Sequence, residues 1–122
     1  MKNFRELRVW QKGLLIAEYS YKLVASFPKE EKFALSLQIT RAAVSISSNI
    51  AEGSSRSSEK DYNRFLQIAL GSAFELETQL LISETIGIGE NQTRKALLIM
   101  LSEEQKMISA LMGKLEKQGT KC

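Results

Sequence analysis

A polar stripe in the first half of the sequence contains the side chains best suited to specific chemistry. Its members are spaced by three or four residues, which places them on one face of a helix: Gln38, Arg41, Ser45, Ser48 and Glu52. Asn49 lies next to this face. Arginine can form a two-pronged pair with a carboxylate, and Glu75 or Glu77 could supply one. We therefore predict a polar network between helices or subunits, with a ligand site and a plain solvated surface as the alternatives.

The sequence lacks the residues that most often carry out catalysis. It contains no histidine, so the commonest general base and metal ligand is missing, and its serines have no His-based triad. The single cysteine, Cys122, is at the chain end, a poor place for a positioned nucleophile. Glu75 and Glu77 are two residues apart and point to different helix faces. With no nucleotide-binding glycine pattern either, we predict no enzymatic activity, no metal site and no cofactor.

The segment from Gly53 to Ser58 is a second place where binding chemistry is possible. It is rich in serine, contains Arg56 and leads into the start of a predicted helix. Free backbone N–H groups and the helix dipole attract anions at such a position, and Arg56 adds a positive charge. The serines are also explained as helix caps, because Asp61 follows Ser58 at the spacing of a capping box. Both interpretations stay open.

Helix-breaking residues divide the chain into four long segments. The breaks lie at Phe27-Pro28, at Gly53–Ser58 and at Gly87–Glu90. The first segment carries a heptad-like seam, which we predict to face the core: Leu7, Trp10, Leu14, Ala17, Tyr21 and Val24. A second apolar stripe widens the first, and we predict that the excess faces another surface: Val9, Ile16, Tyr19 and Leu23.

The second segment is predicted to form a helix that begins just after Pro28 and ends at Gly53. Its apolar stripe has helical spacing: Leu35, Ile39, Ala42, Ile46 and Ile50. The third helix is predicted to begin at the Ser58 cap and to end at Gly87 and Gly89. Its core seam is similar: Tyr62, Leu66, Ala69, Ala73, Leu76 and Leu80. Small residues around Gly71 predict a close approach by another helix.

The fourth helix is predicted to be capped by Asn91. Its stripe is apolar with one exception: Leu97, Leu101, Glu104, Ile108, Leu111 and Leu115. We predict that Glu104 sits at the edge of the stripe and reaches water. The alternative is a buried or inter-subunit ion pair.

Four long helices with short connections predict an all-α fold, an up-down-up-down four-helix bundle. Residues 1–122 form one domain, with a frayed tail at residues 118–122. Hydrophobic residues make up 43% of the chain and charged residues 25%, which suits a globular domain with its own core. The N-terminus has no signal-peptide pattern and no apolar run approaches the roughly 20 residues of a membrane span. We therefore predict a cytoplasmic protein without membrane contact.

Positive charge is concentrated at one end of the predicted bundle. Both termini and the second turn meet there, and they carry nine basic residues: Lys2, Arg5, Arg8, Arg56, Lys60, Arg64, Lys114, Lys117 and Lys121. Nearby acidic residues reduce this to about +4 by formal charge counting. Repeated around an oligomer, such an end would suit a phosphate backbone. The alternative is an ordinary charged surface.

Four stretches of the sequence resemble a known family. They are FRELRVWQKG near the start, SFPKEEKFAL from Ser26, QITRAAVSISSNIAEGSSR over Gln38–Arg56, and RFLQIALGSAFELETQL over Arg64–Leu80. These stretches are similar to the bacterial four-helix-bundle proteins encoded in intervening sequences of large-subunit rRNA genes, often labelled ribosomal proteins. The resemblance covers about residues 3–88, and the fourth helix matches only in character. This chain has Ser47 where the family commonly has proline, and Gly13 where alanine is usual.

The resemblance implies a left-handed bundle that assembles as a homopentamer. It also implies a relation to retroelement accessory variability proteins, which associate with a reverse transcriptase and nucleic acid. We expect a non-enzymatic oligomeric binding module that contacts RNA or another nucleic acid through its basic end. The alternative is a protein-binding scaffold or adaptor with no nucleic-acid role.

Overall fold

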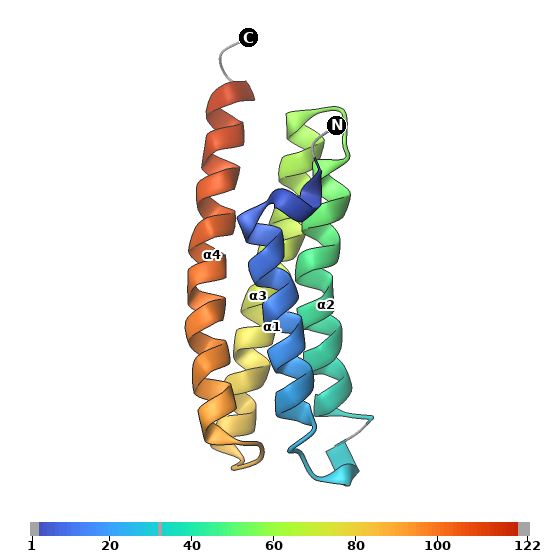
Figure 1. Cartoon of the computed structure of the whole chain (residues 1–122), viewed down its shortest axis with the longest axis vertical. Coiled ribbons are helices and arrows are strands. Elements are labelled where there is room, and N and C mark those ends of the chain that lie inside the picture. The colour runs from blue at the N-terminus through green and yellow to red at the C-terminus, as the bar shows by residue number, and fades with distance from the viewer. Residues whose placement is uncertain (1–2, 32, 120–122) are drawn as a thin grey trace.

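The computed structural model describes residues 3–31 and 33–119, and the helices of this part of the chain form a four-helix bundle. They are η1 (Phe4–Glu6), α1 (Arg8–Val24), η2 (Lys29–Glu31), α2 (Leu35–Ser54), α3 (Glu59–Thr85) and α4 (Asn91–Gly119). Helices adjacent in sequence pack together, and α1 also packs on α4. They run alternately up and down, so that the N-terminus, the α2–α3 turn and the end of α4 share one end (Figure 1). The predicted all-α, up-down-up-down bundle is confirmed.

The core seams of the last three helices are those that the sequence predicts. α2 contributes Ile39, Ala42, Ile46 and Ile50; α3 contributes Leu66, Ala69, Ala73, Leu76 and Leu80; α4 contributes Leu97, Leu101, Ile108 and Leu115. Leu35, Tyr62 and Leu111 are partly buried against this core. None of the helices in the described part of the chain is long and apolar enough to cross a membrane.

The seam predicted for α1 is only partly confirmed, because the neighbouring stripe faces the core most directly. Four residues of the predicted seam are partly buried against that core: Leu7, Trp10, Ala17 and Val24. Val9, Ile16 and Leu23 are buried, whereas Leu14 is 52% exposed and Tyr21 is 57% exposed. The small residues Gly13 and Ser20 are buried on the same face as Val9, Ile16 and Leu23. Both stripes have helical spacing, so apolar periodicity cannot choose between them. The compact face packs more closely on its neighbours, and Leu14 and Tyr21 are left outside.

Two helix boundaries differ from those predicted. The short helix η2 follows Pro28, and α2 begins only at Leu35. Gly53 does not end α2, which continues to Ser54, and its φ is not positive. A Cβ at Gly53 would lie 2.8 Å from the Phe65 Cβ and 3.2 Å from the Tyr62 carbonyl oxygen. Glycine is therefore needed here for the close approach of α3 rather than for a turn.

The boundaries of α3 and α4 follow the sequence more closely. Ser58 caps α3 by accepting a hydrogen bond from the Asp61 backbone N–H at 3.1 Å, as predicted. α3 ends at Thr85, before Gly87 and Gly89, whose φ values are +76° and +87°. Asn91 is the first residue of α4 rather than a cap before it. α4 continues to Gly119, into the predicted tail, and residues 120–122, including Lys121 and Cys122, lie outside the described residues.

Candidate functional site

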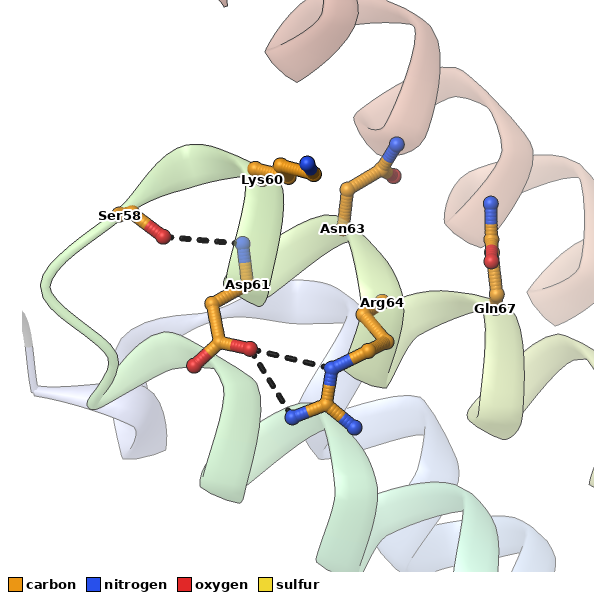
Figure 2. Close-up of a pocket in the computed structure, with 6 residues that line it drawn as sticks. All are labelled: Ser58, Lys60, Asp61, Asn63, Arg64 and Gln67. Atoms are coloured by element: carbon orange, nitrogen blue, oxygen red, sulfur yellow. Dashed lines mark hydrogen bonds and ion pairs between the residues drawn. The ribbon is translucent and has the colours of Figure 1, made fainter.

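The end of the bundle that carries the α2–α3 turn contains an open, polar pocket of about 430 Å³. It is formed by the first turns of α3, and Figure 2 shows its lining: Ser58, Lys60, Asp61, Asn63, Arg64 and Gln67. Arg64 donates hydrogen bonds to one Asp61 carboxylate oxygen from Nε at 3.1 Å and from Nη2 at 2.9 Å. Asp61 and Glu59 thus place negative charge at the helix N-terminus that an anion would otherwise occupy.

Two arginines of the predicted basic end already have carboxylate partners. Arg56 pairs with Glu52 at 2.9 Å and lies 4.0 Å from Asp61, which also holds Arg64. The guanidinium carbons of both arginines lie over the Phe65 ring, at 4.7 Å and 4.6 Å from its centroid. This part of the basic end is largely neutralised by its own neighbours.

The other described basic residues of this end are exposed: Arg5, Arg8, Lys60, Lys114 and Lys117. Arg5 lies over the Phe4 ring at 6.0 Å. Within residues 3–31 and 33–119, Arg5, Arg8, Lys60 and Lys114 form no ion pair with a carboxylate. Lys2, which the sequence also places here, lies outside the described residues. The predicted segments therefore meet at this end, but they carry fewer unpaired positive charges than the sequence predicts.

The predicted polar network divides into three separate groups. Ser45 hydrogen-bonds Ser72 at 2.8 Å, and Asn49 donates to the Ser45 carbonyl oxygen at 2.8 Å. Glu52 pairs with Arg56, as described above. On the α3–α4 side of the bundle, Gln105 donates to Glu77 at 2.9 Å.

Arg41 does not take part in any of these groups, so the predicted network is not made around Arg41 within the described chain, and its inter-subunit form stays a prediction. Gln38, Arg41 and Glu75 are all exposed. In the part of the chain that the structure describes, Arg41 and Glu75 have no hydrogen-bond or ion-pair partner. The physical reason is the orientation of α2: Ile39, Ala42 and Ile46 face the core, so Arg41 faces outward.

The outer side of α1 and α2 forms an apolar groove of about 470 Å³. Tyr21, Val24, Phe27 and Leu37 line it together with Thr40. A neighbouring hollow continues along α2 over Leu37, Thr40, Arg41 and Val44. We call these two hollows the α1–α2 groove. Leu37 and Val44 are exposed, so the groove is apolar surface that the described chain leaves uncovered.

A second exposed apolar surface lies on the C-terminal half of α3. Its large side chains are Phe74, Leu81, Ile82 and Ile86. Gly71 is exposed near the middle of α3, and a Cβ there would have no described atom within 4 Å. The predicted close approach is therefore not made at Gly71 itself, but its small neighbours make it, because Ala73 is fully buried and Ser72 hydrogen-bonds Ser45 of α2 at 2.8 Å. We call this surface, with Glu75 at its edge, the α3 face.

The sequence matches the family model of the 23S rRNA-intervening sequence protein over residues 5–110. The chain belongs to this family. The match includes most of α4, so the family relationship extends beyond residue 88, where the resemblance in the sequence was predicted to end.

A solved structure is similar to this chain and supports its fold. It is a protein of unknown function of the S23 ribosomal protein family from Bacteroides thetaiotaomicron. The two chains are 26% identical, and the match has a TM-score of 0.76 and covers 85% of this chain and 97% of that one. No curated protein matches the chain significantly.

Two buried charged residues of the bundle were missed or misplaced in the predictions from sequence. Arg94, 2% exposed, donates to the Ile88 carbonyl oxygen at 2.7 Å and to Ser83 Oγ at 3.2 Å, and also hydrogen-bonds Asn91. These hydrogen bonds fix the α3–α4 turn. The position of Arg94 just after a glycine-rich turn is the sequence feature that could have indicated this role. Glu104 was predicted to reach water but is fully buried, and it forms no ion pair.

Proposed function

We propose that this protein is a non-enzymatic, self-assembling binding module that acts in the cytoplasm, in which the α1–α2 groove of one copy receives the α3 face of the next. The observation that carries the proposal is the pair of exposed apolar surfaces. Leu37 and Val44 belong to one surface, and Phe74 and Leu81 to the other. Large contiguous apolar patches on a protein surface mark sites of association.

The position of the two surfaces along the bundle supports a contact between copies. Tyr21 is near the end of α1, Leu37 is near the start of α2, and Leu81 is near the end of α3. All three helix ends lie at the end of the bundle opposite the termini (Figure 1). Two copies placed side by side in the same orientation would therefore present the groove and the α3 face at the same level.

The charges beside the two surfaces are complementary. Arg41 lines the groove. In contrast, α3 carries Glu75, Glu77 and Glu84 and has no basic residue after Arg64. Arg41 and Glu75 have no partner among the described residues, so a contact between copies would supply each with one. Because the two surfaces differ, the contact is head-to-tail, and such a contact forms a ring when the rotation between copies closes. The pentamer that the family resemblance implies is the ring we propose.

Charge reversal tests this contact directly. Arg41→Glu and Glu75→Arg should each reduce the assembled mass in light scattering, because each places like charges opposite one another. The double variant should restore it. Lys95→Glu, a charge reversal at an exposed α4 position outside both surfaces, is the matched control and should assemble normally. Loss of mass in both single variants without recovery in the double variant would contradict the pairing of Arg41 with Glu75.

A second observation favours nucleic acid as the bound partner. Arg5, Arg8, Lys60 and Lys114 have no carboxylate partner among the residues described, and a ring would bring these side chains from every copy to one rim. Such a rim would bind an RNA backbone by neutralising phosphates. Affinity should then fall steeply with salt, with a log–log slope of about 0.7 for each single-strand phosphate contacted.

The RNA proposal is tested by filter binding with two variants of equal charge change. Arg8→Glu/Lys114→Glu should abolish the binding of single-stranded RNA, and Lys95→Glu/Lys106→Glu should retain it. Light scattering on both variants checks that assembly is intact. Equal RNA affinity of the two variants would show that the basic end is not the site. Absence of RNA binding by the wild type would favour the protein-scaffold alternative.

A further inference from the structure

Glu104 is a carboxyl group in the interior of the bundle without a hydrogen-bond donor. Its side chain is 0% exposed, and neither carboxylate oxygen has a partner in the described part of the molecule. Leu101 and Ile108, its neighbours on the inner face of α4, are also fully buried. An ionised carboxylate is costly in such surroundings unless a charge or several donors compensate it. Burial accordingly raises the pKa of Glu104 to about 8, although the positive charge of Lys12 lowers it.

The carboxyl group fits into a notch that α1 and α2 leave open. A Cβ on Gly13 would lie 3.1 Å from Glu104 Oε2 and 3.3 Å from the Ser47 Cβ. Gly13 therefore makes room for the carboxyl group, and Ser47 borders the same space. Gly13 and Ser47 are also the two positions at which this chain differs from the residues that are common in the family.

One charged group acts on Glu104 at this notch. It is Lys12 of α1, whose positive charge favours the ionised carboxylate. Glu77 of α3 accepts a hydrogen bond from Gln105 at 2.9 Å and is not among the charges that act on Glu104. α2 presents the uncharged Ser47, whose Oγ donates to the Val44 carbonyl oxygen. Lys12 is thus the cation available to an ionised Glu104.

Lys12 lies between two carboxyl groups that are adjacent in sequence. Its Nζ pairs with Glu103 Oε1 at 2.7 Å on the surface, and its chain neighbour Gly13 borders Glu104 inside. A surface groove of about 380 Å³, lined by Arg8, Gln11, Lys12, Leu15 and Met107, opens beside the pair. The Lys12 side chain thus borders open space at the α1–α4 seam.

We propose that Lys12, Glu103 and Glu104 form a proton-controlled switch in the seam between α1 and α4. When Glu104 carries a proton, Lys12 pairs with Glu103 and the seam is closed. When Glu104 loses that proton to water, Lys12 turns inward to the new carboxylate, Glu103 becomes unpaired, and the seam loosens around Gly13. The switch does not depend on assembly or RNA binding, because it lies within one bundle.

Carbon NMR of the wild-type protein tests the switch at its source. The Glu104 carboxyl carbon should titrate with a midpoint near pH 8 instead of the ordinary 4.5. In Lys12→Met the midpoint should rise further, because the cation that favours the ionised form is removed. A Glu104 midpoint near 4.5, or one that Lys12→Met leaves unchanged, would overturn the proposal.

Hydrogen exchange tests the structural consequence. In the wild type, the α1 amides around Gly13 should lose protection, relative to the intrinsic exchange rate, as pH rises through the Glu104 midpoint. Glu104→Gln, which keeps the neutral shape, should abolish this loss, whereas Glu103→Gln should retain it. Equal pH dependence in the wild type and Glu104→Gln would contradict the switch. If Glu104→Gln does not fold, the carbon titration of the wild type and Lys12→Met decides.

Discussion

The arginines beside the α2–α3 turn at the basic end form ion pairs, whereas the arginine of the α1–α2 groove forms none within the described part of the chain. At the basic end, Arg56 pairs with Glu52, Arg64 pairs with Asp61, and both lie over Phe65. In the groove, Arg41 lies beside exposed apolar side chains and has no partner among the described residues. The two arginines beside the α2–α3 turn are thus locally compensated, whereas the lone arginine of α2 is not.

This difference shows that unpaired charges and exposed apolar side chains indicate a binding surface better than net charge does. Arginines that are already paired gain little from a new partner, because an exposed ion pair contributes at most about 1 kcal/mol and is screened by salt. An apolar groove loses contact with water when it is covered, which contributes roughly 25 cal/mol for each Å² buried. We therefore expect changes in the groove to have larger effects than changes at the paired arginines.

The largest effect is expected from a charge placed inside the groove. Val44→Glu should reduce the assembled mass to that of a single chain, because a carboxylate would be buried against the apolar α3 face. Circular dichroism should stay helical, since Val44 is exposed in the isolated bundle. The matched control is Ile99→Glu, at an exposed apolar position on α4 outside both surfaces. A full assembled mass for Val44→Glu would remove the groove from the contact.

The second largest effect is expected in the pH dependence of the free energy of unfolding. It arises from Glu104 inside the bundle and from neither the groove nor the basic end. The pKa of Glu104 is raised in the folded state, so the native protein holds a proton that the unfolded chain releases above about pH 4.5. The free energy of unfolding should therefore decrease as pH rises from about 4.5 to about 8, by up to about 1.4 kcal/mol per pH unit, and then level off. Denaturant titrations should show a flatter profile for Glu104→Gln. Parallel profiles would show that Glu104 is not responsible.

Substitutions at two helical glycines, Gly71 and Gly53, are expected to have an intermediate effect, because the two sites differ in the atoms that surround them. Gly71→Ala should raise the helix stability of the single chain by about 1 kcal/mol, since a Cβ there meets no described atom. It should also weaken assembly, because it thickens the α3 face. Gly53→Ala should destabilise the bundle, because its Cβ would lie 2.8 Å from the Phe65 Cβ. Thermal unfolding and light scattering measure both effects. Assembly of Gly71→Ala as tight as that of the wild type would place the contact elsewhere on α3.

The smallest effect is expected at the paired arginines. Arg56→Gln should change the free energy of unfolding by less than about 1 kcal/mol, because its pair with Glu52 is exposed. It should also weaken RNA binding less than Arg8→Glu/Lys114→Glu does. A larger loss of RNA affinity in Arg56→Gln, measured by filter binding at the same salt concentration, would reverse the ranking of the two regions.

Helical periodicity was sufficient to predict the fold but not every helix orientation. The longest regular apolar stripes of α2, α3 and α4 are the ones buried in the core, so their spacing identified it. α1 has two adjacent apolar stripes, and the choice depends on how closely Gly13 and Ser20 allow α1 to pack, which is a property of the assembled bundle. Arg41 shows a related limit: spacing placed it in one stripe with Ser45, but did not show that Ser45 would bond Ser72 of α3 while Arg41 stays exposed.

Glu104 shows a different limit of sequence reasoning. Its place in the apolar row of α4 was visible, but a carboxyl group in such a row usually reaches solvent. The room for it comes from Gly13 on another helix, and no pattern within α4 contains that information. The basic end was predicted from topology, and the local pairing that reduces its charge became visible only with side-chain geometry.

The most direct test of self-assembly is the mass of the wild-type protein in solution. Light scattering at micromolar concentration should give a single species of several chains, with five times the chain mass of 13.7 kDa as the expected value. A stable dimer would contradict the ring but keep the association. A folded, helical monomer of 13.7 kDa at that concentration would contradict the proposal that the α1–α2 groove and the α3 face join copies of this chain.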